Sequence, residues 1–346
     1  MKWQWSLLST ALFGSFALAQ GTPEKLNSPK DSNPISLASP DTTLNSGNPI
    51  LFPPEAAPEP PSSRLSGNHN FDNFIGFLSN PIRNVDPRAM TEIYPLYGAA
   101  YFNGTPALPG GNFQAFGPGI TVALSERLAV GLNDGGYAVA DLNKGGNGFF
   151  QNRFGRVFNR LDFSGQREGW VDFGGFAQYT IIEDVPAQFL LTAGLYLETP
   201  TGSKAIFQGN GPANMAPYMT FGKEFGNYHI LGTTGYQFPL GGGSSTTHVF
   251  FSNVHFDRKC FGWLYPLVEF NYNVSATSHD VSLPTRQGFI SLGNFDTEGD
   301  TLTVSAGANA VIVKSKLEFG AVYTTSIASQ SKFDVNAFLI KMVLRY

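Results

Sequence analysis

The chain has 346 residues, a formal net charge of -4 at pH 7 and 14% charged residues, whereas average globular proteins carry about a quarter. The negative balance argues against a nucleic-acid-binding protein, and the single Cys260 allows no intramolecular disulfide and lacks metal-ligand spacing. Mean hydropathy is -0.09 and no later stretch is continuously apolar over ~18 residues, which excludes an α-helical membrane protein.

Residues 1–19 have the form of a secretory signal peptide. Lys2 supplies positive charge, the run from Leu7 to Leu18 is apolar, and Ala17-Leu18-Ala19 is an A-x-A cleavage pattern. The run is shorter than the ~20 residues that a spanning helix needs, and no cysteine follows the cleavage pattern to accept a lipid. We therefore expect residues 1–19 to be removed on export, so that the mature chain begins at Gln20.

Residues 20–67 are rich in Pro, Ser and Asn and contain little that a folded core would bury, as in PPEAAPEPP at 53–61. Such a composition cannot offset the conformational entropy lost on ordering. We expect a disordered periplasmic tail. It is either a plain linker or a tether that contacts the cell wall or another partner.

The lead-in segment, residues 68–92, contains a short apolar pattern. Its apolar side chains recur at positions i, i+3, i+4 and i+7, which predicts one face of a helix: Phe71, Phe74, Ile75 and Leu78. The sequence Ser79-Asn80-Pro81 would end that helix. Two placements are open: a helix packed against the periplasmic rim of a barrel, or an N-terminal plug that enters its lumen.

From residue 93 onward the chain consists of apolar-rich segments of about twelve residues, which we interpret as strands. The predicted strands are 93–103, 112–124, 127–139, 170–182, 185–198, 213–224, 227–239, 246–258, 261–274, 300–312, 315–327 and 333–346. Their number is even, as single-chain bacterial barrels require, and the 14% aromatic content suits the interfacial girdles of such barrels.

The connections between these segments alternate between tight and long. Tight turns are predicted at Ser125-Glu126, Glu183-Asp184, Phe225-Gly226, Lys259-Cys260 and Lys314. Most of the others are longer, and those at 140–169 and 275–299 could fold over the pore. Short periplasmic turns and longer outside loops are typical of membrane barrels, whereas a soluble β-sandwich gives no reason for this alternation.

Alternation along single strands indicates one lipid-facing surface. Phe189, Leu191, Ala193, Leu195 and Leu197 form one face of their strand, opposite a more polar face. The sequence thus predicts an all-β fold, a transmembrane antiparallel up-and-down barrel of about twelve strands at 93–346, in contact with outer-membrane lipid.

The C-terminus repeats the alternation most regularly. Apolar side chains occupy every second position and the chain ends on an aromatic: Phe338, Ile340, Met342, Leu344 and Tyr346. We expect this strand to close the barrel, to face lipid, to place Tyr346 at the periplasmic interface, and to be recognised by the barrel-assembly machinery.

Two short motifs and the strand-and-loop layout of residues 90–346 carry a family resemblance. The motifs are LETPTG at 197–202, which closes a strand, and the C-terminal strand with its aromatic end. The chain resembles the transporter-like barrels of the MetA-pathway phenol-degradation family, which are distantly similar to long-chain fatty-acid transporters. The resemblance implies a pore for small, often hydrophobic molecules. It assigns no substrate-binding residue to this chain.

Several polar residues fall opposite the apolar face of their strands and are candidates to line the pore. They are Asp172, Gln178, Gln188, Glu198, Glu269, Asn271, Lys316 and Glu318. They would set the polarity and ion preference of the lumen, or they would only solvate a water-filled interior and pair with one another.

The loop at 140–169 contains arginines at helical spacing opposite several phenylalanines. Arg153, Arg156 and Arg160 would lie on one side of an amphipathic helix. Packed inside the mouth, they would constrict the pore and attract anions; on the outside, they would contact the outer leaflet or solvent.

The sequence also allows an enzyme, because Asn253, His255 and Asp257 share one strand face. Same-face neighbours repeat every ~6.6–7 Å, which suits a polar stripe better than a hydrogen-bonded catalytic group. The remaining histidines match no zinc motif, and no cofactor motif occurs. We predict a non-enzymatic outer-membrane pore for passive uptake or export of small, hydrophobic or aromatic solutes. A structural or surface-interaction barrel with a closed lumen is the alternative, and an outer-membrane hydrolase the third.

Overall fold

The computed structural model describes residues 65, 67–103, 110–143, 148–151, 157–161, 164–209, 212–241, 247–277, 299–329 and 334–346. All of them belong to one compact unit, Glu59–Tyr346. The predicted signal peptide and nearly all of the predicted tail lie outside the described residues. Among the described residues, no helix is long and apolar enough to cross a membrane.

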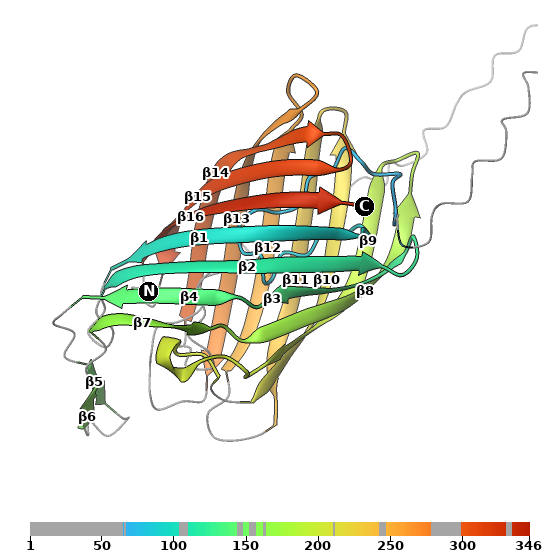
Figure 1. Cartoon of the computed structure of the whole chain (residues 1–346). Coiled ribbons are helices and arrows are strands. Elements are labelled where there is room, and N and C mark those ends of the chain that lie inside the picture. Colours follow the sequence, from blue (N-terminus) through green and yellow to red (C-terminus); the bar gives the residue numbers. More distant parts are fainter. Residues whose placement is uncertain are drawn as a thin grey trace, which may run out of the picture. The chain divides into compact units, whose positions relative to one another are not determined.

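The described unit is a closed antiparallel β-barrel (Figure 1). Its strands are β1 (Glu92–Phe102), β2 (Gly111–Ala123), β3 (Leu128–Asp134), β4 (Tyr137–Leu142), β7 (Gly165–Trp170), β8 (Phe173–Asp184), β9 (Phe189–Thr199), β10 (Ala213–Phe225), β11 (Tyr228–Leu240), β12 (Thr247–Arg258), β13 (Leu264–Thr277), β14 (Gly299–Val313), β15 (Leu317–Ser329) and β16 (Val335–Arg345). From β8 to β16 each strand pairs with its neighbours in sequence, and β1 closes the ring by pairing with both β16 and β2.

Two barrel positions are each shared by two strands. β2 pairs with β3 near one end and with β4 near the other, while β8 pairs with β3 and β7 with β4. Gly135 and Gly136 make the first break, with φ of 145° and 142°, a region that favours glycine. The barrel therefore has twelve strand positions, which confirms the predicted count and fold class. The strands predicted at 127–139 and 170–182 are each interrupted.

One end of the barrel carries only short connections, and we call it the short-turn end. They fall at 124–127, 185–188, 226–227, 259–263 and 314–316, close to the predicted tight turns. The start of β1 and the end of β16 lie at this same end. The opposite, long-loop end carries the longer connections, so the predicted alternation of loop length is confirmed.

The outer face of the barrel is apolar. On β9, Leu195 and Leu197 are 45% and 43% exposed, while Thr192, Tyr196 and Glu198, at alternate positions of the strand, are buried on the inside. Phe338 and Leu344 of the C-terminal strand also point outward, and Ile340 and Met342 share their face. Aromatic side chains gather at the short-turn end, as in an interfacial girdle: Phe225, Tyr228, Phe261, Trp263 and Tyr346.

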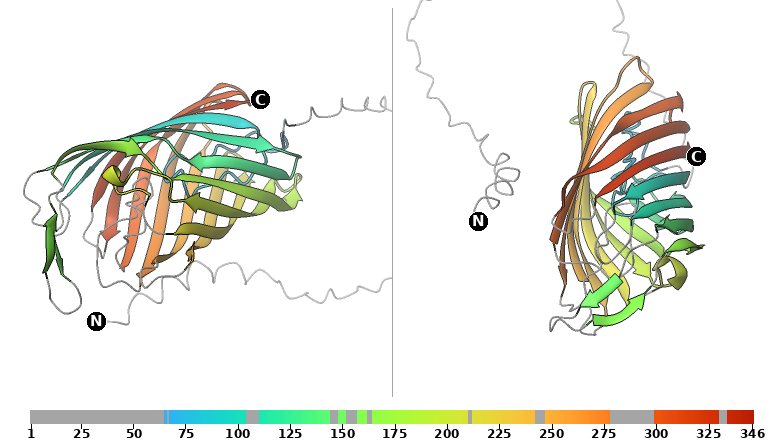
Figure 2. Two further views of the ribbon diagram at one scale, coloured as in Figure 1. Left: turned by 60° about the horizontal axis from the view of Figure 1, so that its bottom comes forward. Right: turned by 90° about the vertical axis from the view of Figure 1, so that its left-hand side faces the viewer.

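The predicted lead-in helix is wrong. Residues 67–91, which we call the lumen segment, contain only turns and extended backbone, and they run inside the ring of strands (Figure 2). Both ends lie together, since Gly67 is bridged to Met90 and the Asn68 amide donates to Ala89 O at 2.8 Å. Of the two placements predicted, the structure has the plug. Its apolar residues contact walls on more than one side, so their helical spacing does not need a helix.

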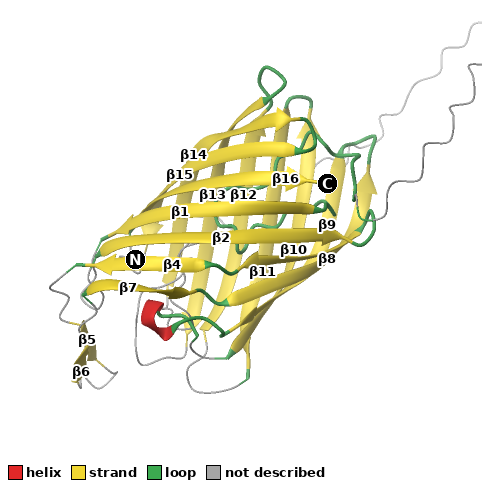
Figure 3. Ribbon diagram, viewed as in Figure 1, coloured by secondary structure: helices red, strands yellow, loops and turns green. Residues whose placement is uncertain are grey.

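The predicted amphipathic helix in the 140–169 loop is also wrong. β5 (Gly148–Gln151) and β6 (Val157–Leu161) pair there as a two-stranded sheet of their own. Arg153 and Arg156 lie outside the described residues, and Arg160 falls within β6. The helical element of the described chain is the short 3-10 turn η1 (Lys204–Ile206), beside β7 (Figure 3).

We expect Leu195→Arg to test the lipid contact of this face. A charge near the middle of a lipid-facing strand costs about 2–4 kcal/mol of folding free energy, against about 0–1 near the interface. Asn112→Arg, at an exposed position near the end of β2, is the matched control. Denaturant unfolding in lipid vesicles measures both. Equal, small losses would contradict a membrane-embedded outer face.

Candidate functional site: the occupied lumen

A row of hydroxyl and amide side chains runs around the inside of the barrel wall. They are Thr180, Thr192, Thr220, Thr233, Asn253 and Asn271, which are successive cross-strand partners from β8 to β13. Thr180 and Thr192 are 3.1 Å apart at their hydroxyls, and the Thr233 hydroxyl donates to Thr220 at 3.0 Å. Cross-strand partners lie at one height, so these side chains form a continuous polar girdle.

The polar girdle and its neighbour Gln178 hydrogen-bond to backbone carbonyls of the lumen segment. Thr192 donates to Pro87 O at 2.6 Å and Thr220 to Val85 O at 3.0 Å. The Gln178 amide donates to Asp86 O at 2.8 Å. A buried carbonyl must find a donor. The turns of the lumen segment supply backbone donors only to a few carbonyls, such as Phe71 O and Asn80 O. The wall therefore replaces the internal hydrogen bonds that a helix would have made.

Glu269 binds the same segment through its backbone amides. Its carboxylate accepts the Leu78 N–H at 2.9 Å and the Ser79 N–H at 2.6 Å, and it also accepts the Ser79 hydroxyl. The side-chain amide of Asn271, one inward position further along β13, donates to the Ser79 hydroxyl oxygen at 2.9 Å. Two backbone N–H donors aimed at one buried carboxylate fix the position of the segment at this point.

Behind Glu269 lies a row of alternating carboxylates and imidazoles, which we call the acid–imidazole row. His255 Nδ1 is 2.7 Å from Glu269, and His255 Nε2 is 2.9 Å from Asp257. Asp257 in turn is 2.6 Å from His229 Nδ1, and Glu224 lies 3.9 Å from the other ring nitrogen. The row crosses β13, β12, β11 and β10 near the short-turn end.

The acid–imidazole row is covered by the lumen segment. Phe74 makes an edge contact with the His229 ring at 5.6 Å between centroids, and Phe77 makes one with His255 at 5.5 Å. The expectation that His255 and Asp257 are too far apart to bond is wrong. Nevertheless, the nearby Ser79 hydroxyl bonds to Glu269, whereas a serine nucleophile needs a base such as imidazole.

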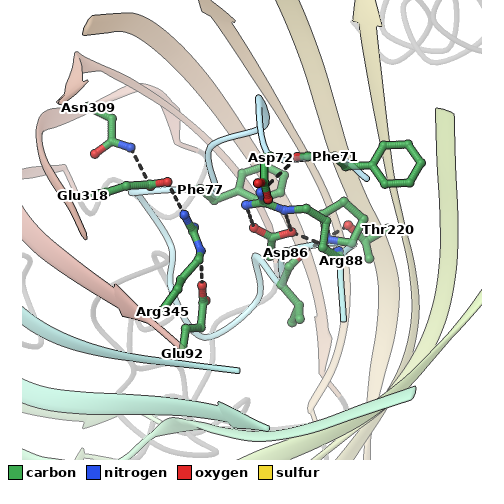
Figure 4. Close-up of polar contacts among 12 residues, drawn as sticks. Phe71, Asp72, Phe77, Asp86, Arg88, Glu92, Thr220, Asn309, Glu318 and Arg345 are labelled. Carbon is green, nitrogen blue, oxygen red and sulfur yellow. Dashed lines mark hydrogen bonds and ion pairs between the residues drawn. The ribbon is translucent and has the colours of Figure 1, made fainter. Parts of the chain in front are cut away.

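Arg88 stabilises the conformation of the lumen segment through bonds to other residues of that segment (Figure 4). Its guanidinium donates to both oxygens of Asp86, at 2.9 and 2.6 Å, and to Phe71 O at 3.2 Å. Burial is the largest single influence on Asp86 and opposes its ionisation, but the charge and hydrogen bonds of Arg88, together with the charge of Arg345, lower its pKa from 3.8 to about 2. The stability from this pair is present above pH 3.8 and is lost as the pH falls through about 2.

A second buried ion cluster joins the strands that close the barrel (Figure 4). Arg345 of β16 donates to Glu92 of β1 at 2.9 Å and also to Glu318 of β15, which accepts from Asn309 of β14 at 2.8 Å. Each carboxylate thereby has a cationic partner. The cluster spans the junction between the first and last strands.

Apolar contacts fix the tip of the lumen segment. Ile82 and Val85 pack against an aromatic band on the wall: Phe176, Tyr196, Tyr218 and Phe251. A Cβ on Gly194 would clash with the Tyr218 ring, so glycine there lets the ring lie flat along the wall. A small cavity remains beside this packing, lined by Val85 and Phe176 together with Arg88, Glu92 and Lys341. The segment thus packs against walls on several sides.

The predicted pore-lining residues divide into two groups. The side chains that are buried on the inner face are Gln178, Glu198, Glu269, Asn271 and Glu318. Gln188 instead lies in the turn between β8 and β9, where its amide donates to Val185 O, and Lys316 is in the turn before β15.

Asp172 lies in the break between β7 and β8. Its carboxylate accepts the amides of Gly202 and Gly209, at 2.7 and 2.9 Å, and so anchors the loop that follows β9. This explains the glycine that ends the LETPTG motif, because a Cβ on Gly202 would meet the backbone of β7 and the Asp172 amide.

The polar girdle and the ion pairs of Arg88 and Arg345 were not predicted from the sequence. Inward threonines were visible strand by strand. Only the register between strands brings them into one row.

Comparisons with known proteins agree with the fold. No family model matches the chain, and no curated protein matches it. A solved structure, the COG4313 outer membrane channel from Pseudomonas putida F1, is similar with a TM-score of 0.50 at 10% identity, covering 77% of this chain and 98% of that one. The β domain of the Bordetella autotransporter BrkA has a TM-score of 0.43 at 13% identity, covering 74% and 99%. The likeness to the COG4313 channel thus supports the fold, a closed antiparallel β-barrel of the kind found in outer-membrane proteins, and the MetA-pathway resemblance stays a prediction.

We expect the double variant Thr192→Val, Thr220→Val to loosen the lumen segment. Each change keeps the side-chain volume but leaves a buried carbonyl without its donor, costing about 1 kcal/mol or more. A loss of about 2 kcal/mol in total makes the open state of the lumen segment roughly 30-fold more populated. Hydrogen exchange at the Leu78 and Ser79 amides should become faster by the same factor. Thr234→Val, which removes a hydrogen bond within the wall, is the control. Unchanged exchange in the double variant would refute the role of the girdle.

We expect Arg345→Met to destabilise the barrel by about 3 kcal/mol, because Glu92 and Glu318 lose their buried cation. Arg127→Met also removes a carboxylate partner, Glu183, but the Arg127 side chain is 47% exposed against 2% for Arg345. That control should cost at most about 1 kcal/mol. Denaturant unfolding, followed by the shift in gel mobility between folded and heat-denatured barrel, measures the loss of stability in both variants. Equal losses would contradict the role of Arg345 as the buried cation that joins the closing strands.

Proposed function

We propose that the chain is an outer-membrane channel for small solutes, closed in this conformation by the lumen segment. The observation that carries the proposal is the way this segment is held. It enters and leaves at the short-turn end, and its contacts with the wall are side-chain hydrogen bonds and apolar packing. It can therefore withdraw as a loop without breaking the pairing between barrel strands.

Withdrawal leaves groups that water can satisfy. The hydroxyls and amides of the polar girdle would exchange the segment's carbonyls for water, and such exchanges are nearly neutral in enthalpy. The cost of opening lies mainly in the apolar contacts of Phe71, Phe74 and Phe77 with the wall. An equilibrium between closed and open states is thus physically accessible.

The proposal includes the predicted route to the membrane. Residues 1–19 would direct export, residues 20–67 would form a periplasmic tail that is either a linker or a contact with the cell wall, and the strand ending at Tyr346 would be recognised by the assembly machinery. The predicted preference for hydrophobic or aromatic solutes belongs to the family resemblance. The arginines at 153, 156 and 160 remain candidates for constricting the mouth.

A structural barrel with a permanently closed lumen is the second candidate, and the buried lumen segment itself favours it. The hydrolase alternative has less support, because the lumen segment covers His255 and Asp257. The two main candidates differ in whether removing the segment creates a conducting path.

We expect replacement of residues 68–89 by a short Gly-Ser linker to convert rare openings into a steady conductance in planar bilayers. Gly67 and Met90 are already neighbours, so the linker strains nothing. The full-length protein is the control, and both must show the same heat-modifiable barrel. A folded deletion variant that stays non-conducting would contradict a channel and favour the structural barrel.

A further inference from the structure

The wall behind the lumen segment is acidic on one side. The inward faces of β10, β12 and β13 carry Glu224, Asp257 and Glu269, and they share only two imidazoles between them. Three carboxylates against two imidazoles and the Lys259 ammonium leave a net negative charge whenever at least one histidine is neutral. The side of the lumen formed by these strands is therefore anionic.

One cation lies near the row: the Lys259 ammonium, in the turn after β12, donates to Asn73 of the lumen segment at 2.7 Å. The other inward cations lie elsewhere. Lys341 and Arg345 are on β16, six strand positions around the ring from β10. Arg345 is already paired with Glu92 and Glu318, and Lys341 lies over the Tyr94 ring at 4.4 Å. Arg167 faces inward on β7, close to the long-loop end. Within the described strands, the acid–imidazole row thus has no lysine or arginine beside it on the wall.

In the closed state the lumen segment provides hydrogen-bond donors and aromatic cover to the acid–imidazole row. The Leu78 and Ser79 amides stabilise Glu269, and Phe74 and Phe77 shield the imidazoles from the lumen. When the segment leaves, these carboxylates line the path. A carboxylate-lined constriction with low-dielectric walls raises the local concentration of cations and repels anions.

The wall across from this acidic side is apolar toward the long-loop end. Its inward side chains come from β1, β2, β4 and β16: Ala100, Phe102, Phe113, Ala140, Leu142 and Val335. In a ring of twelve positions, β1 and β2 face β11 and β12. The inward amides of Gln237, Asn253 and Asn273 line the facing strands. A solute on this path would meet an apolar wall and an amide wall before it reaches the acidic row.

From this arrangement we infer that the opened lumen selects small organic cations, namely protonated amines that carry an apolar body. The inference rests on the proposed channel function and adds its substrate class. The apolar wall accommodates the body of the solute, and the carboxylates of Asp257 and Glu269 attract the ammonium group. An aromatic or aliphatic carboxylate of the same size is rejected at the same row.

The first test measures charge selectivity in the variant that lacks residues 68–89. In a KCl gradient across a planar bilayer, the reversal potential should give a potassium permeability severalfold above that of chloride. In the same background, Asp257→Asn with Glu269→Gln should bring the ratio close to one. Asp141→Asn, an exposed acid on β4, should leave it unchanged. Chloride preference, or a ratio untouched by the double variant, would overturn the inference.

The second test needs no substitution in the wall and so does not depend on how the double variant folds. Liposomes that contain the deletion variant are placed in a solution of benzylammonium or of benzoate, and the rate at which they swell measures entry of the solute. The two solutes share an aromatic body and differ in charge. Benzylammonium should enter severalfold faster. Equal rates, or faster benzoate, would overturn the inference while leaving the channel intact. A variant with no conductance and no uptake would overturn the proposed channel and this inference together.

Discussion

The rest of the structure depends on one requirement, that backbone N–H and C=O groups removed from water find partners. In the wall, closure of β1 onto β16 meets it for every strand. In the lumen, the irregular backbone of residues 67–91 meets it through donors and acceptors on the wall, from Thr192 and Gln178 to Glu269. The inner surface of the barrel wall is polar, and its side chains provide the lumen segment with the hydrogen-bond partners that secondary structure would otherwise provide.

The barrel could be predicted from the sequence because a membrane imposes simple rules on each strand by itself. Period-two alternation at 189–198 and 338–346, together with the spacing of tight turns, fixed the strands and the outward face. The two strand breaks were not predicted. They depend on close backbone approach at Gly135 and Gly136, and on the Asp172 carboxylate that anchors a loop thirty residues further along the chain.

The site was harder to predict than the fold, because it depends on which residues of different strands share a height. Glu269 and Asn271 were found by alternation alone, but their partners are in the lumen segment and on β12. The apolar spacing of Phe71, Phe74 and Leu78 was read as a helix, since periodicity assumes a single buried face. A segment enclosed by wall on several sides has no such face, and its Leu78 and Ser79 amides donate to Glu269 instead of to carbonyls one helical turn earlier.

The distribution of polar contacts separates what holds the barrel from what holds the lumen segment. The cluster around Arg345 joins β1, β15 and β16 through hydrogen bonds between side chains of those strands. The girdle and Glu269 bind the segment, yet the strands that carry them are paired by backbone hydrogen bonds on both sides. Loss of the segment therefore removes a closure without removing a wall. Because the same carboxylates that secure the closed state would line the open path, closing the lumen and selecting its solutes are two uses of one set of side chains.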